Sequence, residues 1–393
     1  MDRLNADILF LKCMNIRQLL LISSLILSLL LLSDCKSQSG KNANPNEVRV
    51  LDVKLDLTEP SYKELFSNCE VIKLDSDPEA LLSYIETCIC VGDSILMCDL
   101  PNCNVVLFSP DGRFLNKIGT KGNGPEDYYL CYDIAVNPAS GDISLLNPMG
   151  ELIDYDKDSR FLKRERLKGK PNYYSCKWLD DKIMVRWSAV EEDEACLVVY
   201  DTESNKVLWE DWYDDFVFNF RRFHPFYEYM EDVYFAAPMT NDVYLVGDSS
   251  LILKYTWKFT PDNLPTAYLD EMRNVVDKND KNERFIQDMK DRTLSNVPVF
   301  NGETENYYYV NLRTGIKDEA IYRSVFYNKR KDKYLVFDKF REGMTFRPIY
   351  MNERFMLCQV PYGEVETYNK LFGLNIECTE DENPLLAKFY FKE

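Results

Sequence analysis

One four-stranded unit recurs along this sequence, and its last two strands are joined each time by the same kind of polar turn. Each copy places Asp together with Gly, Ser or Asn between two apolar stretches, a pattern typical of a β-hairpin. The copies are FSPDGRF (108–114), YDKDSRF (155–161), YDTESNKV (200–207) and FYNKRKDKYLV (326–336). Recurrence of one such element predicts an all-β fold, the β-propeller, in which each blade packs its faces against its neighbours.

Six copies of this unit can be followed, so we expect a six-bladed β-propeller of four-stranded antiparallel blades over residues 48–393. Hydrophobic residues make up 46% of the chain and aromatic residues 13%, which is enough to fill the spaces between blades. In chain order, the units span 94–119, 133–167, 174–212, 232–259, 305–340 and 345–361.

Three strand-like segments lie outside these units. VRVLDVKLDL (48–57) and CEVIKLD (69–75) precede the first unit, and LLAKFYFK (385–392) follows the last. An open ring would leave a bare edge strand, which is prone to pair with other chains. We therefore expect the start and the end of the chain to share one blade, a velcro closure that uses both N-terminal segments.

One insertion, LPTAYLDEMRNVVDKNDKNERFIQDMKDRT (264–293), has helical rather than strand spacing. Its apolar residues at helical spacing are Leu269, Met272, Val275, Val276, Phe285, Ile286 and Met289. The pattern predicts two short amphipathic helices between the fourth and fifth blades. They either cover an edge or one face of the ring, or form a lid over a ligand funnel.

The first 34 residues have the features of a secretory signal peptide. LLLISSLILSLLLL (19–32) is apolar except for its serines and follows Arg17. An apolar run of about 14 residues is short for a helix that crosses a bilayer, which needs about 20. MNIRQ (14–18) forms an ordinary positively charged start, which favours Met14 as the first residue. The alternative is an N-terminal membrane anchor that is never cleaved.

The sequence LSDC (32–35) resembles the lipobox of bacterial lipoproteins, although Asp34 stands where a small residue is usual. The resemblance implies that Cys35 is the lipidated first residue of the mature chain, an effectively permanent anchor. The polar KSQSGKNANPNE (36–47) reads as a flexible tether. No acidic run follows Cys35, which favours the outer membrane facing the periplasm; exposure on the cell surface is the alternative.

The only dense glycine cluster, IGTKGNGPEDYY (118–129), is not a phosphate-binding loop. A Walker motif needs Lys and a hydroxyl where Pro125 and Glu126 stand, and no helical periodicity follows to suit a dinucleotide motif. We interpret the cluster as a blade connection in which Gly122 and Gly124 allow backbone angles that other residues resist. Tyr128 and Tyr129 are interpreted as residues that pack inside the protein; the alternative is that they contact a ligand.

The longer run FSPDGRFLNKIGTKGNGPEDYY (108–129) is similar to the signature of six-bladed β-propeller lipoproteins of Bacteroidota, an NHL-repeat-like family. NPLLAKFYFK (383–392) is similar to the last strand of that family. The resemblance covers 48–393 and implies architecture alone, because a fold does not define a function. The residues that match the motif are Asp111, Gly112, Gly119, Gly122, Gly124, Pro125 and Tyr128.

The charge of the chain limits its binding partners, and its histidine and cysteine content limits metal sites and disulfides. A net charge of −18 repels nucleic acid and anionic lipid, so we expect no nucleic-acid partner and membrane contact only through the N-terminal lipid. No metal site is predicted, because the chain lacks C-x-x-C and its only histidine, His224, has no cysteine near it. Most of the twelve cysteines are expected to be buried thiols, with Cys98 and Cys103 the best candidates for a disulfide.

These observations favour a binding or interaction module for a glycan, a peptide or an envelope protein. RRFHPFYEY (221–229) concentrates arginine, histidine and aromatic residues. Arg347 and Arg313 lie near predicted strand starts, where they could equally be salt-bridge partners. The candidate ligand face is Arg222, His224 and Arg347. The competing interpretation of the aromatic segment is an inter-blade strand with aromatic core contacts. Similar six-bladed folds imply a second function, a calcium-dependent hydrolase or lyase acting in the central channel. No other cofactor is predicted, and no G-x-S-x-G or H-E-x-x-H motif is present.

Overall fold

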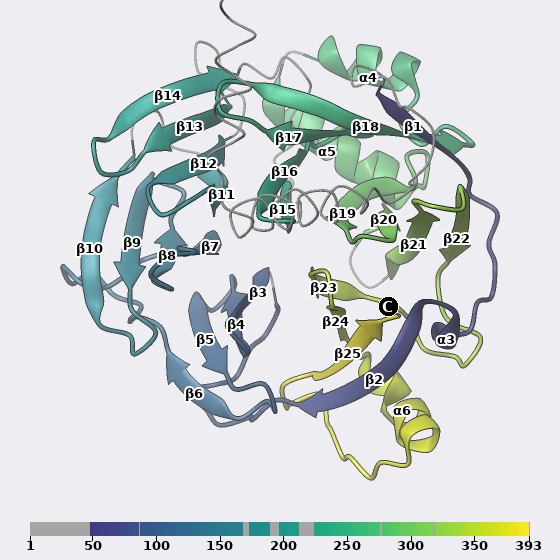
Figure 1. The fold of residues 1–393 in the computed structure, drawn as a ribbon, viewed down its shortest axis with the longest axis horizontal. Helices are drawn as coiled ribbons and strands as arrows, with labels where there is room; N and C mark the ends of the chain where they lie inside the picture. The colour runs from purple at the N-terminus through teal and green to yellow at the C-terminus, as the bar shows by residue number, and fades with distance from the viewer. Residues whose placement is uncertain are drawn as a thin grey trace, which may run out of the picture. The chain divides into compact units, whose positions relative to one another are not determined.

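Six antiparallel sheets surround a central channel in the computed structural model of the protein (Figure 1). The structure describes residues 48–85, 87–167, 173–188, 196–211, 224–275, 277–316 and 319–392. Val48–Glu393 forms one compact unit. The expected signal peptide (1–34), Cys35 and the tether (36–47) lie outside the described residues. The predicted six-bladed β-propeller is confirmed.

Five blades are built from consecutive strands, each running from the channel outward. The first contains β3 (Thr87–Val91), β4 (Ser94–Asp99), β5 (Asn104–Phe108) and β6 (Phe114–Lys117). The second contains β7 (Asp133–Val136), β8 (Ile143–Leu146), β9 (Glu151–Tyr155) and β10 (Phe161–Arg166). The third contains β11 (Tyr173–Trp178), β12 (Ile183–Ser188), β13 (Leu197–Asp201) and β14 (Lys206–Asp211). The fourth contains β15 (Phe226–Tyr229), β16 (Asp232–Ala236), β17 (Asp242–Val246) and β18 (Leu251–Thr260). The fifth contains β19 (Val297–Glu303), β20 (Tyr307–Thr314), β21 (Ile321–Asn328) and β22 (Lys333–Phe337).

The sixth blade joins the two ends of the unit, which confirms the velcro closure. Its strands are β23 (Pro348–Met351), β24 (Phe355–Gln359), β25 (Leu385–Phe391) and, outermost, β2 (Phe66–Lys73). β2 pairs antiparallel with β25 over its whole length. Phe66 on β2 is fully buried in the aromatic cluster shared by the fifth and sixth blades, so closure also completes the core there.

The first N-terminal segment does not take part in this closure, contrary to our expectation. β1 (Arg49–Lys54) instead pairs in parallel with β18 and adds a fifth strand to the fourth blade (Figure 1). β18 follows β17 as the outer strand of this blade, so its other edge is open, and its ten residues are long enough to pair with all six residues of β1. Leu51 and Val53 of β1 are fully buried there in a cluster with Trp257.

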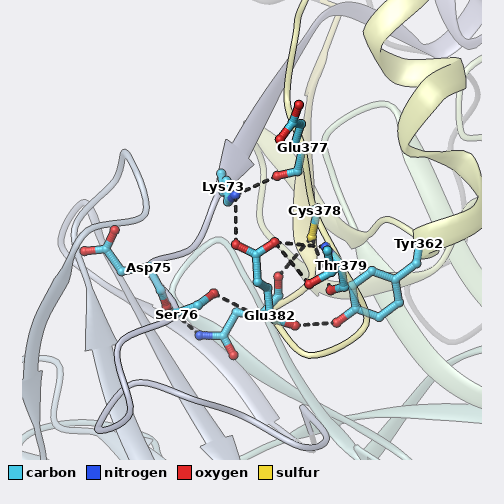
Figure 2. Close-up of polar contacts among 9 residues, drawn as sticks. Lys73, Asp75, Ser76, Tyr362, Glu377, Cys378, Thr379 and Glu382 are labelled. Carbon is cyan, nitrogen blue, oxygen red and sulfur yellow. Dashed lines mark hydrogen bonds and ion pairs between the residues drawn. The ribbon is translucent and has the colours of Figure 1, made fainter.

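A polar network fastens the closure at the segment between β24 and β25, which contains η2 (Tyr362–Glu364) and α6 (Val365–Phe372). Figure 2 shows Lys73, at the end of β2, donating a 2.6 Å hydrogen bond to the Glu377 carbonyl and pairing with Glu382 at 3.1 Å. Tyr362 donates to the Glu382 carbonyl at 2.6 Å (Figure 2). A further short helix, α3 (Tyr62–Leu65), links β1 to β2. The start and end of the unit are therefore joined by side chains as well as by strands.

The two predicted helices are present as α4 (Thr266–Arg273) and α5 (Lys278–Lys290). The Asp277 side chain caps α5 by accepting bonds from its first free backbone N–H groups. Met272, Phe285 and Met289 are buried in one cluster that also contains Met239 and Val297 of the fourth and fifth blades. The helices therefore cover two neighbouring blades, which supports the first of the two roles considered for them.

The glycine-rich connection joins β6 to β7 as a packed loop. The left-handed backbone conformation occurs at Gly119, with φ +65°, and not at Gly122 or Gly124. Those two glycines are constrained differently, because a Cβ atom on either would lie within 3 Å of the Asp127 carboxylate. Tyr128 is fully buried and donates a 2.8 Å hydrogen bond to the Cys103 carbonyl, so it packs as expected.

Most cysteines of the described residues are buried free thiols. Burial raises the pKa of Cys69 to about 12, which keeps this thiol unreactive. The expected pairing of Cys98 with Cys103 is wrong. Cys98 lies 3.6 Å, sulfur to sulfur, from Cys131, while the Cys103 thiol contacts the Leu100 carbonyl. The turn between β4 and β5 directs Cys103 away from its neighbour.

Candidate functional site

A cavity of about 420 Å³ opens at the mouth of the central channel, where the innermost strands begin. It is formed mainly by the fifth and sixth blades, with additions from the segments that precede β3 and β15. Its size lies in the range of small-molecule sites. The thirteen lining residues are Tyr84, Ile85, His224, Val299, Phe300, Asn311, Arg313, Ala320, Tyr322, Arg347, Pro348, Ile349 and Gln359.

Two arginines flank one tyrosine ring in this cavity. The guanidinium carbon of Arg313, on β20, lies 5.8 Å from the centre of the Tyr322 ring, and that of Arg347, just before β23, lies 5.9 Å from it. Both distances allow a cation–π interaction. Because the three residues come from two blades, the packing of the fifth blade against the sixth is what brings them together.

The two arginines differ in how they are held. Arg313 is buried, with 3% of its surface exposed, and its Nε donates a 3.1 Å hydrogen bond to the Gly315 carbonyl. Arg347 is exposed, and its side chain has no hydrogen-bond or ion-pair partner among the described residues. The site thus combines one fixed guanidinium with one that can engage an incoming group.

His224 lines both this cavity and a smaller one of about 100 Å³ further along the innermost strands. The smaller cavity also contains Asn301, which is 8% exposed and whose Oδ1 atom has no partner within the described part of the chain. An unpaired buried oxygen costs free energy unless water or a ligand satisfies it. The channel therefore offers a polar path that continues from the mouth cavity.

Asp133, at the start of β7, is a structural anion of the channel wall. Its carboxylate accepts hydrogen bonds from Ser175 Oγ at 2.5 Å, Cys176 N at 3.0 Å and Thr87 Oγ1 at 3.3 Å. Burial raises the pKa of Asp133, and the hydrogen bond from Ser175 and the nearby His224 oppose that rise. These hydrogen bonds join the innermost strands of three neighbouring blades, so the carboxylate stabilises the packing of these blades around the channel.

The described residues contain no group of three or more His, Cys, Asp or Glu side chains that could hold a metal ion. Calcium needs several oxygen ligands that converge on one point. Asp133 is already occupied by hydrogen-bond donors, and the other channel carboxylate, Glu228, pairs with Lys177 at 2.7 Å. Both of these channel carboxylates are therefore engaged by donors of the protein itself.

The structure brings together two of the three candidate ligand-face residues, His224 and Arg347, in one cavity. Arg222 lies outside the described residues. The end of the aromatic segment, Phe226–Tyr229, is the innermost strand β15, with Tyr227 buried against Tyr234, so the competing interpretation is right for that part.

The sequence places Arg313, like Arg347, near a predicted strand start, but it does not distinguish Arg313 from a salt-bridge partner, and it gives no signal for the neutral members of the cavity. The matched motif residues between Asp111 and Tyr128 do not line either cavity.

The ring of six four-stranded blades around a channel defines a six-bladed β-propeller. The chain belongs to the family described as Domain of unknown function (DUF4934), which matches residues 48–390. No curated protein matches it. Within the described residues, no helix is both long enough and apolar enough to cross a membrane.

Two solved structures from Bacteroides share the fold. BF0058 of Bacteroides fragilis NCTC 9343, named as an exported protein, is 18% identical, with a TM-score of 0.71 over 88% of this chain and 100% of its own. A member of the DUF4221 family from Bacteroides vulgatus ATCC 8482 is 10% identical, with a TM-score of 0.52 over 84% of this chain and 97% of its own. At these identities the likeness concerns the fold alone.

Proposed function

We propose that this protein is a lipid-anchored β-propeller of the bacterial cell envelope that binds a glycan, a peptide or a segment of an envelope protein at the mouth of its channel. The observation that carries the proposal is the mouth cavity, in which Arg347, Tyr322 and Gln359 present polar side-chain groups that have no hydrogen-bond partner among the described residues. Such groups are the usual means by which a pocket orients a ligand. No observation in the described chain favours the hydrolase or lyase.

The envelope location is supported by two independent features. The LSDC sequence ending at Cys35 resembles a lipobox, and the NHL-like motif from Asp111 to Tyr128 resembles the signature of propeller lipoproteins. BF0058, which has the same fold, is named as an exported protein. Together they favour an outer-membrane lipoprotein that faces the periplasm.

Filling the cavity should abolish binding without disturbing the ring. Gln359 is half-buried at the end of β24, and the indole of Gln359→Trp would occupy the cavity. For ligands selected on glycan and peptide arrays, we expect titration calorimetry to show at least about a tenfold loss of affinity. Gln287→Trp, on the exposed side of α5, is the matched control and should bind normally. Equal affinity in both variants would place the site elsewhere.

Lipidation can be tested separately from binding. Cys35→Ser removes the only thiol that the lipobox offers, so we expect it to lose incorporation of labelled palmitate and to leave the membrane fraction. Cys378→Ser, which changes a half-buried thiol of the propeller, should retain both properties. Unchanged palmitate labelling of Cys35→Ser would refute the lipoprotein assignment.

A further inference from the structure

We propose that the mouth cavity recognises the carboxylate group of an acidic sugar, a uronic acid residue, with Arg347 as the residue that engages it. The proposal rests on the proposed function, because it names the ligand class of the same site. It follows from three properties of the cavity: its charge, the arrangement of its two guanidinium groups and its neutral polar lining.

The charge of the cavity is opposite to that of the protein. The chain has 65 acidic against 47 basic residues and a net charge of −18. None of the thirteen lining residues is acidic, whereas two arginines, Arg313 and Arg347, are among them. A patch of positive charge on an acidic protein repels cations and focuses anions toward one point. The ligand is therefore expected to carry negative charge.

The arrangement of the arginines suits a carboxylate. Arg313 and Arg347 both lie about 6 Å from the centre of the Tyr322 ring, so they belong to a single site. A guanidinium group is planar and offers two parallel N–H donors, which match the two oxygens of a carboxylate. Arg347 has no polar partner in the described chain and can make this bidentate contact without breaking another.

The remaining lining favours a sugar as the carrier of that carboxylate. Gln359 offers an amide, and Tyr322 offers a hydroxyl and a ring; neither side chain has a hydrogen bond with another described residue. Amide and hydroxyl groups suit the hydroxyls of a sugar. The cavity lies where strands begin and end, instead of along a strand edge that an extended peptide could join. A compact polyhydroxylated acid therefore fits better than a peptide chain.

The test compares acids with their uncharged forms. Trisaccharides of galacturonate and of glucuronate are titrated into the full propeller, each beside its methyl ester, which keeps the sugar and removes the charge. We expect at least one free acid to bind, and its ester to bind about tenfold or more weakly, because a charge-assisted contact is lost. Arg347→Gln should cause a similar loss. Arg341→Gln, which alters an exposed arginine on the same connection, should not.

The outcomes separate this inference from the proposed function. Equal binding of acid and ester, or unchanged affinity in Arg347→Gln, overturns the inference; if Gln359→Trp still blocks the bound sugar, the proposed function survives. A third outcome is that neither uronate binds, whereas a tripeptide with a free C-terminal carboxylate binds and the same tripeptide as its C-terminal amide does not. That outcome overturns the sugar and identifies the ligand as a peptide. If no ligand from the uronate, peptide or array panels responds to Gln359→Trp, both proposals are refuted. A thermal unfolding scan of each variant checks that the propeller remains folded.

Discussion

Replacing Asn383 by alanine is expected to lower the free energy of unfolding by about 3–5 kcal/mol, although the substitution removes only one small side chain. Asn383 is fully buried where the last strand begins. Its side-chain amide donates to the carbonyl oxygens of Asp75 at 2.6 Å and Ala80 at 2.9 Å, and its carbonyl accepts from the backbone N–H of Leu82 at 2.8 Å.

The size of the effect follows from what the substitution leaves behind. Alanine would leave three buried backbone groups without partners, and each unsatisfied group costs about 1–3 kcal/mol. These groups belong to the segment that leads from β2 to β3, while Asn383 leads into β25. The asparagine therefore joins the start of the unit to its end at the closing blade, beside the ion pair between Lys73 and Glu382 (Figure 2).

Chemical denaturation followed by tryptophan fluorescence would measure this loss. Asn279→Ala, which removes an exposed asparagine side chain from α5, is the control and should change stability by less than about 0.5 kcal/mol. Asn383→Asp keeps an acceptor for Leu82 but loses both amide donors, so we expect it to be as harmful as alanine. A loss below about 1 kcal/mol for Asn383→Ala would show that the closure does not depend on this side chain.

The blades could be predicted from the sequence because their signal is local. Each blade repeats a turn between two strands that are neighbours in the chain, and the two helices show their spacing directly in Met272, Phe285 and Met289. The position of β1 could not be predicted in this way. Its partner is the open outer edge of β18, about two hundred residues later in the chain, and nothing in the local sequence of β1 indicates that strand.

The candidate site was predictable only in part, for a related reason. His224 stood out as the only histidine, in a segment rich in aromatic residues. Arg313, Tyr322 and Arg347 form one site only because two blades lie side by side around the channel. Most of β21 and all of β22 lie between Tyr322 and Arg347 in the chain. A contact between blades depends on the closed ring, so no local pattern can report it.

A buried ion pair of the fifth blade, which lies where that blade contacts the fourth, gives the second large effect. Glu303 and Lys329 are joined by a 2.6 Å contact, with only 6% and 13% of their side chains exposed. The Lys329 ammonium also lies 4.2 Å from the centre of the Tyr229 ring, and Tyr227 donates to the second Glu303 oxygen at 3.2 Å. Burial raises the pKa of Glu303 and lowers that of Lys329, and each partner opposes the shift of the other.

Lys329→Met is expected to destabilise the protein by about 3–5 kcal/mol at neutral pH, because it leaves the Glu303 carboxylate buried without its countercharge. The double variant Glu303→Gln with Lys329→Met removes both charges and should recover most of that loss. The exposed pair of Arg330 and Glu305 lies directly beside this one in the chain. Arg330→Met should therefore change the free energy of unfolding by less than about 1 kcal/mol.

The dependence on pH distinguishes a buried charge from simple loss of packing. Without Lys329, burial holds the pKa of Glu303 further above its unfolded value, so the folded state binds the proton more tightly than the unfolded chain. The penalty of Lys329→Met should then be greatest above the folded pKa and should shrink as the pH falls toward the unfolded value of about 4.3. Urea denaturation at about pH 8 and at about pH 4 compares the two ends of this range. A penalty that is equal at the two pH values would assign the loss to packing of the lysine stem against Tyr229 and not to the charge of Glu303.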